Sequence, residues 1–163
     1  MIKNVEKKFS KKLQSYNLIN FFRFFSSMIE FKKITILFII LLKIGYLSKK
    51  QIRNFLIGIF STIILKNFFR RKRPFKNYQS IKNYDKKYFD EYSFPSGHSF
   101  TAFYIALVLC CKINNLIVKN TILVISLIIS LSRVYLGVHY ASDVLFSLIL
   151  ARYIINFNGH AFY

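Results

Sequence analysis

The sequence predicts an all-α, multi-pass transmembrane helix bundle, and two features lead to this fold class. Long apolar runs follow one another through the chain, whose 163 residues are 54% hydrophobic. Basic residues gather at the ends of these runs, as they do in proteins that cross a bilayer several times. No segment shows the sustained alternation of a lipid-facing barrel strand. The chain is therefore expected to form apolar helices whose ends are marked by charge.

The charge of the chain narrows its possible partners. It has 25 Lys and Arg against 6 Asp and Glu, a net charge of +19. Such a charge is typical of proteins that bind nucleic acid or lie at anionic membranes. Because the cations flank apolar runs, we expect the bilayer as a partner and no nucleic acid. The adjacent Cys110 and Cys111 lie in an apolar run and form no metal or redox motif.

Five apolar segments are predicted to be membrane helices. A spanning helix needs about 20 residues, so the polar residues that flank each run should lie within the helices. Residues 1–31 are set apart as a basic segment followed by a stretch, 15–31, that Arg23 and Glu30 interrupt. This stretch is interpreted as a weak membrane pass or, preferably, an amphipathic helix in the interface. Residues 32–163 form a single domain, with helices expected at 34–47, 55–69, 100–111, 116–131 and 141–157.

The order of the helices predicts which connections share a membrane face. The loop 70–93 and the turn 132–140 are separated by two helices, so they lie on the same face. The turns 48–53 and 112–119 lie on the opposite face, which carries cations and is expected to be cytoplasmic. The first face is also basic, which weakens the charge rule; its cations are Arg70, Arg71, Lys72, Arg73, Lys76, Lys82, Lys86 and Lys87.

Two patches of chemically useful residues fall on that first face. In KNFFRRKRP, Lys66 and Arg73 are seven positions apart and project from nearly the same side of a helix. In FPSGHS, a proline opens the next helix, whose free N–H groups and dipole favour an anion. Gly97 lets a ligand approach the backbone, and His98 stands beside it. Taken singly, the patches are also compatible with a basic membrane flank and with a helix start that carries a surface histidine.

The third patch, SRVYLGVHYASD, lies on the same membrane face. His139 and Asp143 have the i, i+4 spacing of one helix face. A carboxylate there can accept the N–H of one ring nitrogen and leave the other as a nucleophile or base. Arg133 belongs to the end of the preceding helix. An ion pair that only holds the bundle together is the alternative, but ionisable groups at a membrane edge favour function. The three patches together predict a tetrahedral-anion site with a nucleophile and an acid.

The pattern K-x6-RP, PSGH and SR-x5-H-x3-D resembles the type 2 phosphatidic acid phosphatase (PAP2) family of membrane lipid phosphatases. The resemblance covers about residues 55–150 and implies the helical core that this family shares with vanadate-dependent haloperoxidases. Where members often carry a small residue, commonly glycine, shortly after the start of the aspartate helix, this chain has Phe146 and Ser147. The matching positions are Lys66, Arg73-Pro74, Pro95-Ser96-Gly97-His98, Ser132-Arg133, His139 and Asp143.

The resemblance implies a role for each position. His139 would attack phosphorus and form a phosphohistidine, and Asp143 would orient it. His98 would protonate the leaving lipid oxygen and then help water to attack. The phosphoryl oxygens would be held by Lys66, Arg73, Arg133, Ser96 and Gly97. No metal or other cofactor is expected, because a two-metal phosphatase needs several convergent carboxylates and only Asp143 of the acidic residues lies in a motif.

The expected function is hydrolysis of a lipid phosphate headgroup in a bacterial inner membrane, at a site on the extracytoplasmic face. Phosphatidylglycerol phosphate, phosphatidic acid, undecaprenyl diphosphate and a lipid A phosphate all fit as substrates. Cations of the loop 70–92 would attract an anionic headgroup, by about 1 kcal/mol each. One alternative is a non-catalytic lipid-phosphate-binding protein, which would tolerate loss of a catalytic residue. Another is a transporter, which needs polar residues within several helices, whereas only Lys43 is conspicuous.

Overall fold

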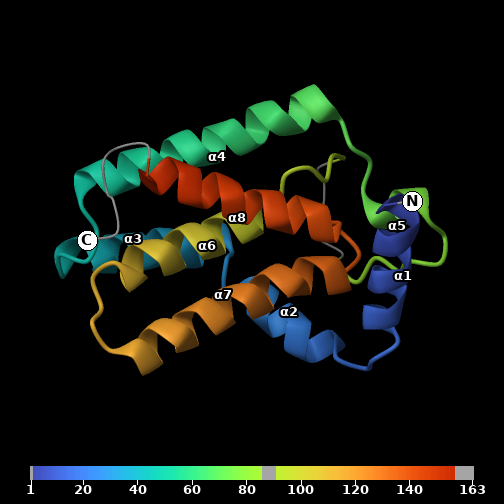
Figure 1. Cartoon of the computed structure of the whole chain (residues 1–163), viewed down its shortest axis with the longest axis horizontal. Helices are drawn as coiled ribbons and strands as arrows, with labels where there is room; N and C mark the ends of the chain where they lie inside the picture. The colour runs from blue at the N-terminus through green and yellow to red at the C-terminus, as the bar shows by residue number, and fades with distance from the viewer. Residues whose placement is uncertain (1, 86–90, 157–163) are drawn as a thin grey trace.

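The computed structural model describes residues 2–85 and 91–156. All the secondary-structure elements in these two ranges are helices (Figure 1). The all-α prediction is confirmed. Lys86, Lys87 and the end of the predicted helix 141–157 lie outside the described residues. The helices are α1 (Ile2–Gln14), α2 (Ile19–Ser27), α3 (Phe31–Lys43), α4 (Lys49–Phe69), α5 (Pro74–Asn77), α6 (Gly97–Cys110), α7 (Leu116–Tyr135) and α8 (Ala141–Asn156).

The helix that follows the PSGH motif lies at the centre of the bundle. α6 packs against α4, α7 and α8, and its side chains from Ser99 to Val108 are buried. Aromatic rings fill the contact with α4, where Phe55 lies 6.0 Å from Phe100 and 5.5 Å from Tyr104 between ring centroids. Gly58 makes this contact possible, because a Cβ there would lie 2.0 Å from Cζ of Phe100. The start of α6 is therefore held in place by neighbouring helices.

The outer surface of the bundle is apolar, as a lipid-facing surface must be. Large apolar side chains are exposed along α4, α7 and α8, among them Phe60, Leu127 and Ile149. α4 and α7 are each long and apolar enough to cross a membrane, and α6 is a shorter apolar helix. Small polar residues lie inside instead, where they let helices approach closely and bond across the interface. These buried residues include Asn54, Thr62, Ser126, Ser130 and Ser147.

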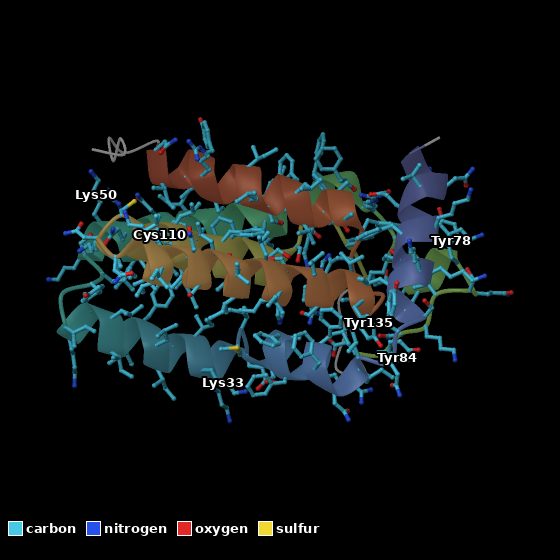
Figure 2. The ribbon with its side chains drawn as sticks, turned by 60° about the horizontal axis from the view of Figure 1, so that its bottom comes forward. Lys33, Lys50, Tyr78, Tyr84, Cys110 and Tyr135 are labelled. Atoms are coloured by element: carbon cyan, nitrogen blue, oxygen red, sulfur yellow. The ribbon has the colours of Figure 1, made fainter. Side chains whose placement is uncertain are left out.

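The stretch 15–31, for which the sequence left two interpretations, forms the short helix α2. Its nine residues extend about 14 Å, which is too short to span a bilayer. α2 packs on α7, with Phe22 stacked on Tyr135 at 4.5 Å. α2 and α3 then run one after the other along the bundle (Figure 2). The chain therefore covers the length of the bundle here with a broken helix.

Two observed helices, α4 and α7, extend well beyond their apolar runs, whereas α3 ends at Lys43, four residues before the predicted end at 47. α4 begins at Lys49 rather than at residue 55, because Ser48 and Gln51 form a capping box. In it the backbone N–H of Ser48 donates to Gln51 Oε1 at 2.8 Å, and that of Gln51 donates to Ser48 Oγ at 3.2 Å. α7 continues to Tyr135, four residues past the predicted end at 131. The polar residues that flank these two apolar runs thus lie within α4 and α7.

The connections lie at two ends of the bundle in the predicted arrangement. Lys50 and Cys110, near the turns 44–48 and 111–115, lie at one end (Figure 2). Tyr78, Tyr84 and Tyr135 lie at the other, where α4 and α7 end and α6 and α8 begin. α1 lies across this second end (Figure 1). All three sequence patches therefore belong to one end of the molecule, together with the N-terminal helix.

Candidate active site

The turn between α7 and α8 is fixed by hydrogen bonds on both sides. The backbone N–H groups of Val138 and His139 both donate to the carbonyl of Arg133 at 3.2 Å. The carbonyl of Gly137 accepts from the backbone N–H of Phe75 at 3.2 Å. Gly137 has a φ of 78°, and a Cβ there would lie 2.3 Å from the carbonyl oxygen of Lys82. Only glycine fits this position, so the turn and the loop after α4 hold each other in place.

The geometry around His139 defines which of its ring nitrogens carries the proton. Its side chain is buried, and Nδ1 lies 2.6 Å from the carbonyl oxygen of Ser93. A carbonyl only accepts, so Nδ1 carries the proton and Nε2 keeps its lone pair. Nε2 lies 3.4 Å from Nη1 of Arg73. The unprotonated nitrogen of His139 therefore faces a guanidinium group.

Asp143 is close to His139, but its shorter contacts are with other groups. Its Oδ2 lies 3.6 Å from Nδ1 of His139 and accepts from the backbone N–H of Tyr140 at 2.9 Å. Its Oδ1 accepts from Nη1 of Arg71 at 2.7 Å. The closest acceptor to Nδ1 is the carbonyl of Ser93. The Ser93 carbonyl therefore also orients the His139 ring, and it lies closer to Nδ1 than Asp143 does.

The three predicted cations gather around His139. Arg73 is buried and donates from Nη1 to the carbonyl of Val138 at 2.8 Å. Lys66 is half-buried in the last turn of α4. Burial lowers the pKa of His139 well below its usual value, and the charges of Arg73, Lys66 and Arg133 lower it further. The ring is therefore held in its neutral form by its surroundings.

Arg133 is engaged by groups that the sequence did not indicate. It is buried, and its Nη2 donates to Asp85 Oδ2 at 3.0 Å. Its Nη1 donates to Ser26 Oγ. Asp85 comes from the loop after α5, and Ser26 comes from the end of α2. The guanidinium that the sequence assigned to a phosphate is thus paired with a carboxylate here.

The PSGH motif forms the start of α6 and ties it to α8. Ser96 is the N-cap, and its Oγ accepts from the backbone N–H of Ser99 at 3.3 Å. Its own N–H donates to Ser147 Oγ at 3.0 Å, and Ser147 Oγ donates to the carbonyl of Asp143 at 2.7 Å. A Cβ on Gly97 would meet nothing within 4 Å. Ser147 therefore takes the place of the small residue expected near this contact, and open space remains beside Gly97.

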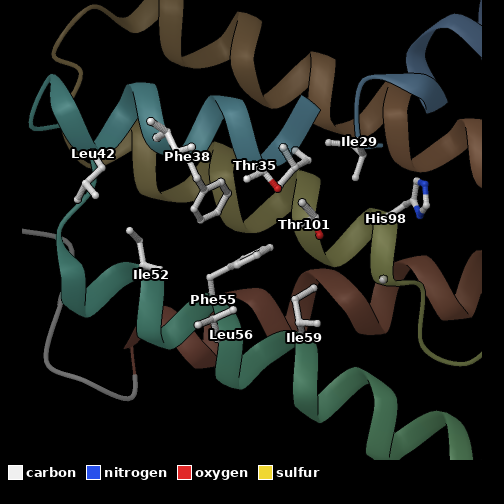
Figure 3. Close-up of a pocket in the computed structure, with 13 residues that line it drawn as sticks. Ile29, Thr35, Phe38, Leu42, Ile52, Phe55, Leu56, Ile59, His98 and Thr101 are labelled. Atoms are coloured by element: carbon white, nitrogen blue, oxygen red, sulfur yellow. The ribbon is translucent and has the colours of Figure 1, made fainter. Parts of the chain in front are cut away.

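His98 joins this cluster to an apolar cavity. Arg133, His139, Lys66 and Arg73 all act on it electrostatically. It also lines, with Gly97 and Thr101, one end of a cavity of about 610 Å³ (Figure 3). No pattern in the sequence indicated this cavity, because its walls are apolar residues like those that face lipid. Its other lining residues come from α3, α4 and the turn before α3: Ile29, Ile34, Thr35, Phe38, Ile39, Leu42, Ile52, Phe55, Leu56 and Ile59.

The chemistry of the cluster suits an anion. Among residues 2–85 and 91–156, no three His, Cys, Asp or Glu side chains come together as a metal site would require. The carboxylates of Glu6, Asp85 and Asp143 each contact an arginine. The cluster itself is made of cations, the start of α6 and two histidines. An oxyanion with an apolar tail matches both the charged cluster and the adjoining cavity.

These features define a multi-pass membrane helix bundle with a cluster of cations and two histidines at one end. The family model of the PAP2 superfamily matches residues 52–161, and the chain belongs to this superfamily. No individually characterised protein sequence matches the chain significantly.

Two solved structures share the fold. A transmembrane PAP2-type phosphatidylglycerolphosphate phosphatase from Bacillus subtilis is 23% identical, with a TM-score of 0.75 over 96% of this chain and 86% of that one. LpxE from Aquifex aeolicus is 24% identical, with a TM-score of 0.74 over 90% of each chain. The integral membrane bundle predicted from the sequence is thereby confirmed.

The state of His139 can be tested directly. At pH 6.5, where an ordinary histidine is half protonated, we expect its ring to be neutral with the proton on Nδ1, because burial and the neighbouring cations disfavour the charged form. Ring ¹⁵N chemical shifts of labelled protein in detergent, assigned with a His139→Asn variant, measure this. A titration midpoint at or above 6.5, or a proton on Nε2, would contradict the geometry.

Proposed function

We propose that this protein is an integral membrane phosphatase that hydrolyses the phosphate ester or diphosphate headgroup of a lipid through a phosphohistidine on His139. The observation that carries the proposal is the position of His139 Nε2, whose lone pair faces Arg73 at 3.4 Å within a cluster of cations. The apolar cavity that ends at His98 supplies a place for the lipid tail. Membership of the PAP2 superfamily supports the same chemistry.

In the first step the phosphate lies among Lys66, Arg73 and Arg133, with the N–H of Gly97 as a further donor. Nε2 of His139 attacks phosphorus, and the bond from phosphorus to the lipid oxygen breaks. His98 gives its proton to that oxygen, so the lipid leaves as an alcohol or, from a diphosphate, as a monophosphate. Phosphoryl transfer depends mainly on such positioning and charge stabilisation.

In the second step His98 takes a proton from water, and the water oxygen attacks the phosphohistidine. The P–N bond breaks, inorganic phosphate leaves, and Nε2 recovers its lone pair. Throughout the cycle the Nδ1 proton faces the carbonyl of Ser93 at 2.6 Å and Asp143 at 3.6 Å. These acceptors stabilise the positive charge that the ring acquires in the covalent intermediate.

The substrate is a lipid phosphate whose hydrocarbon occupies the cavity between α3, α4 and α6. Phosphatidylglycerol phosphate, phosphatidic acid, undecaprenyl diphosphate and a lipid A phosphate share the chemistry that the site requires. The fold it shares with a phosphatidylglycerolphosphate phosphatase and with LpxE supports this class of substrate. No metal takes part in the proposed reaction. The carboxylates that a divalent cation would need, those of Glu6, Asp85 and Asp143, are each paired with an arginine.

A release assay tests the proposal. Purified protein in detergent, with EDTA present, is expected to release phosphate from at least one of these lipids. His139→Ala should lower the rate by about 10³-fold or more, since the nucleophile is lost. His98→Asn should lower it by about 10²- to 10⁴-fold, since proton transfer is lost.

Two outcomes would contradict the proposal. Activity that EDTA abolishes would mean that a metal carries the reaction. Binding of the lipid phosphates by a folded protein that releases no phosphate would identify a non-catalytic binder instead.

The ion pair of Arg133 with Asp85 gives a second test. A phosphate that binds Arg133 has to compete with this carboxylate, so Asp85→Asn should strengthen inhibition by inorganic phosphate by about three- to tenfold. The inhibition constant at fixed ionic strength measures the effect. Glu91→Gln is the matched control, because Glu91 pairs with the exposed Lys76 at 3.3 Å and should leave the constant unchanged. Weaker inhibition by phosphate in Asp85→Asn would show that Asp85 helps Arg133 to bind.

We place the site on the extracytoplasmic face of a bacterial inner membrane. The opposite end carries Lys49, Lys50, Arg53, Lys112 and Lys119, which suit a cytoplasmic face. Cations at the site end, including those of α1, would serve to attract anionic headgroups.

Thiol labelling in intact cells tests this orientation. A cysteine at the exposed Ser80, in a chain with Cys110→Ser and Cys111→Ser, should react with an impermeant maleimide. The native Cys111, which is exposed at the opposite end, should react only after permeabilisation. The reverse pattern would place the site in the cytoplasm.

A further inference from the structure

We propose that Glu6 and Arg71 are positioning residues for the reaction, so that the N-terminal helix α1 takes part in catalysis through the linked ion pairs Glu6–Arg71–Asp143. The inference rests on the proposed function, because it concerns the support of His139 by Asp143. Glu6 lies outside the three sequence patches, and Arg71 lies within the first of them but was given no role there. α1 also precedes the part of the chain that the family model matches.

Arg71 connects three separate segments. Its Nη1 donates to Asp143 Oδ1 at 2.7 Å and to Ser142 Oγ at 2.6 Å. Its Nη2 donates to Glu6 Oε2 at 2.7 Å. Its Cζ lies 3.8 Å from the centre of the Tyr140 ring. Two carboxylates, a hydroxyl group and an aromatic face thus hold the guanidinium in one orientation.

Glu6 completes the arrangement from the side of α1. Its side chain is 7% exposed, on a helix whose other charged residues are lysines. Its Oε1 accepts from Ser142 Oγ at 2.5 Å and from the Ser142 backbone N–H at 3.2 Å. A buried carboxylate is costly unless it is paired and hydrogen-bonded. Glu6 thus contacts both Arg71 and the start of α8, the helix that carries Asp143.

The expected effect on the reaction rate follows from the different contacts that the two oxygens of Asp143 make. Arg71 holds Oδ1, which leaves Oδ2 toward Tyr140 and Nδ1 of His139. The negative charge of Glu6 offsets part of the Arg71 charge. Without Glu6, the positive charge of Arg71 would neutralise more of the negative charge of Asp143. Asp143 would then stabilise the positively charged His139 ring less. The turnover rate should therefore depend on Glu6, although Glu6 does not touch the ring.

Substrate binding should be far less sensitive. The phosphate is assigned to Lys66, Arg73 and Arg133, whereas Arg71 is directed to the carboxylates and Ser142. Loss of Glu6 or Arg71 should thus lower kcat and leave KM nearly unchanged. A residue that only docks α1 onto the bundle would lower thermal stability or raise KM without changing kcat.

The test compares Glu6→Gln, Arg71→Gln and the double variant with the wild type, using the lipid phosphate that the release assay selects. Each single variant is expected to lower kcat about 10- to 100-fold, the range known for residues that orient metal ligands, with KM within about twofold. The double variant should be no slower than Arg71→Gln, because both residues act through Asp143. Glu30→Gln, which removes an exposed partner of Lys33, is the matched control and should retain full activity.

Failure of this inference differs from failure of the proposed function. A wild type without activity, or a His139→Ala variant that keeps it, would overturn the function. Wild-type kcat in Glu6→Gln, while His139→Ala is inactive, would overturn the inference alone. Should Glu6→Gln not fold, Arg71→Lys carries the test. It keeps the charge but not the fork that reaches both carboxylates, so its kcat should fall, and an unchanged kcat would overturn the inference.

Discussion

The structure depends on keeping the buried carboxylate of Asp143 satisfied at the edge of a membrane. Asp143 has no exposed surface, and a buried charge is stable only when it is paired and hydrogen-bonded. Arg71, immediately after α4, supplies the charge, and the N–H of Tyr140 supplies a hydrogen bond. This requirement brings the end of α4 to the start of α8. The same contact places Arg73 beside His139.

The fold followed from the sequence because it depends on local patterns. Apolar runs marked the helices, and alternate passes return the chain to the same end of a bundle. Lys66, Ser96, Arg133 and His139 could thus be placed together from the order of helices alone. The helix boundaries were less accurate, since apolarity does not report caps. The capping box at Ser48 starts α4 well before its apolar run.

Other parts of the site leave no local trace in the sequence. The closest partner of His139 is a backbone carbonyl, that of Ser93, and any residue could supply it. Glu6 and Arg71 are 65 positions apart, and nothing in the basic run around Arg71 distinguishes the arginine that binds Asp143 from its neighbours. The cavity beside His98 is lined by apolar residues whose identity does not reveal whether they face lipid or one another. These features depend on tertiary contacts.

His98 stands where the two halves of the proposed substrate would meet. On one side lie the cations, which recognise a phosphate and do not distinguish one lipid phosphate from another. On the other lies the cavity, whose shape is set by the broken path of α2 and α3 and by the closeness of α4 to α6. A proton donor at this boundary lies where the scissile bond between phosphate and lipid would be. In the proposed reaction, selectivity among lipid phosphates would therefore belong to the apolar walls, while the signature residues would supply the chemistry that all of these substrates share.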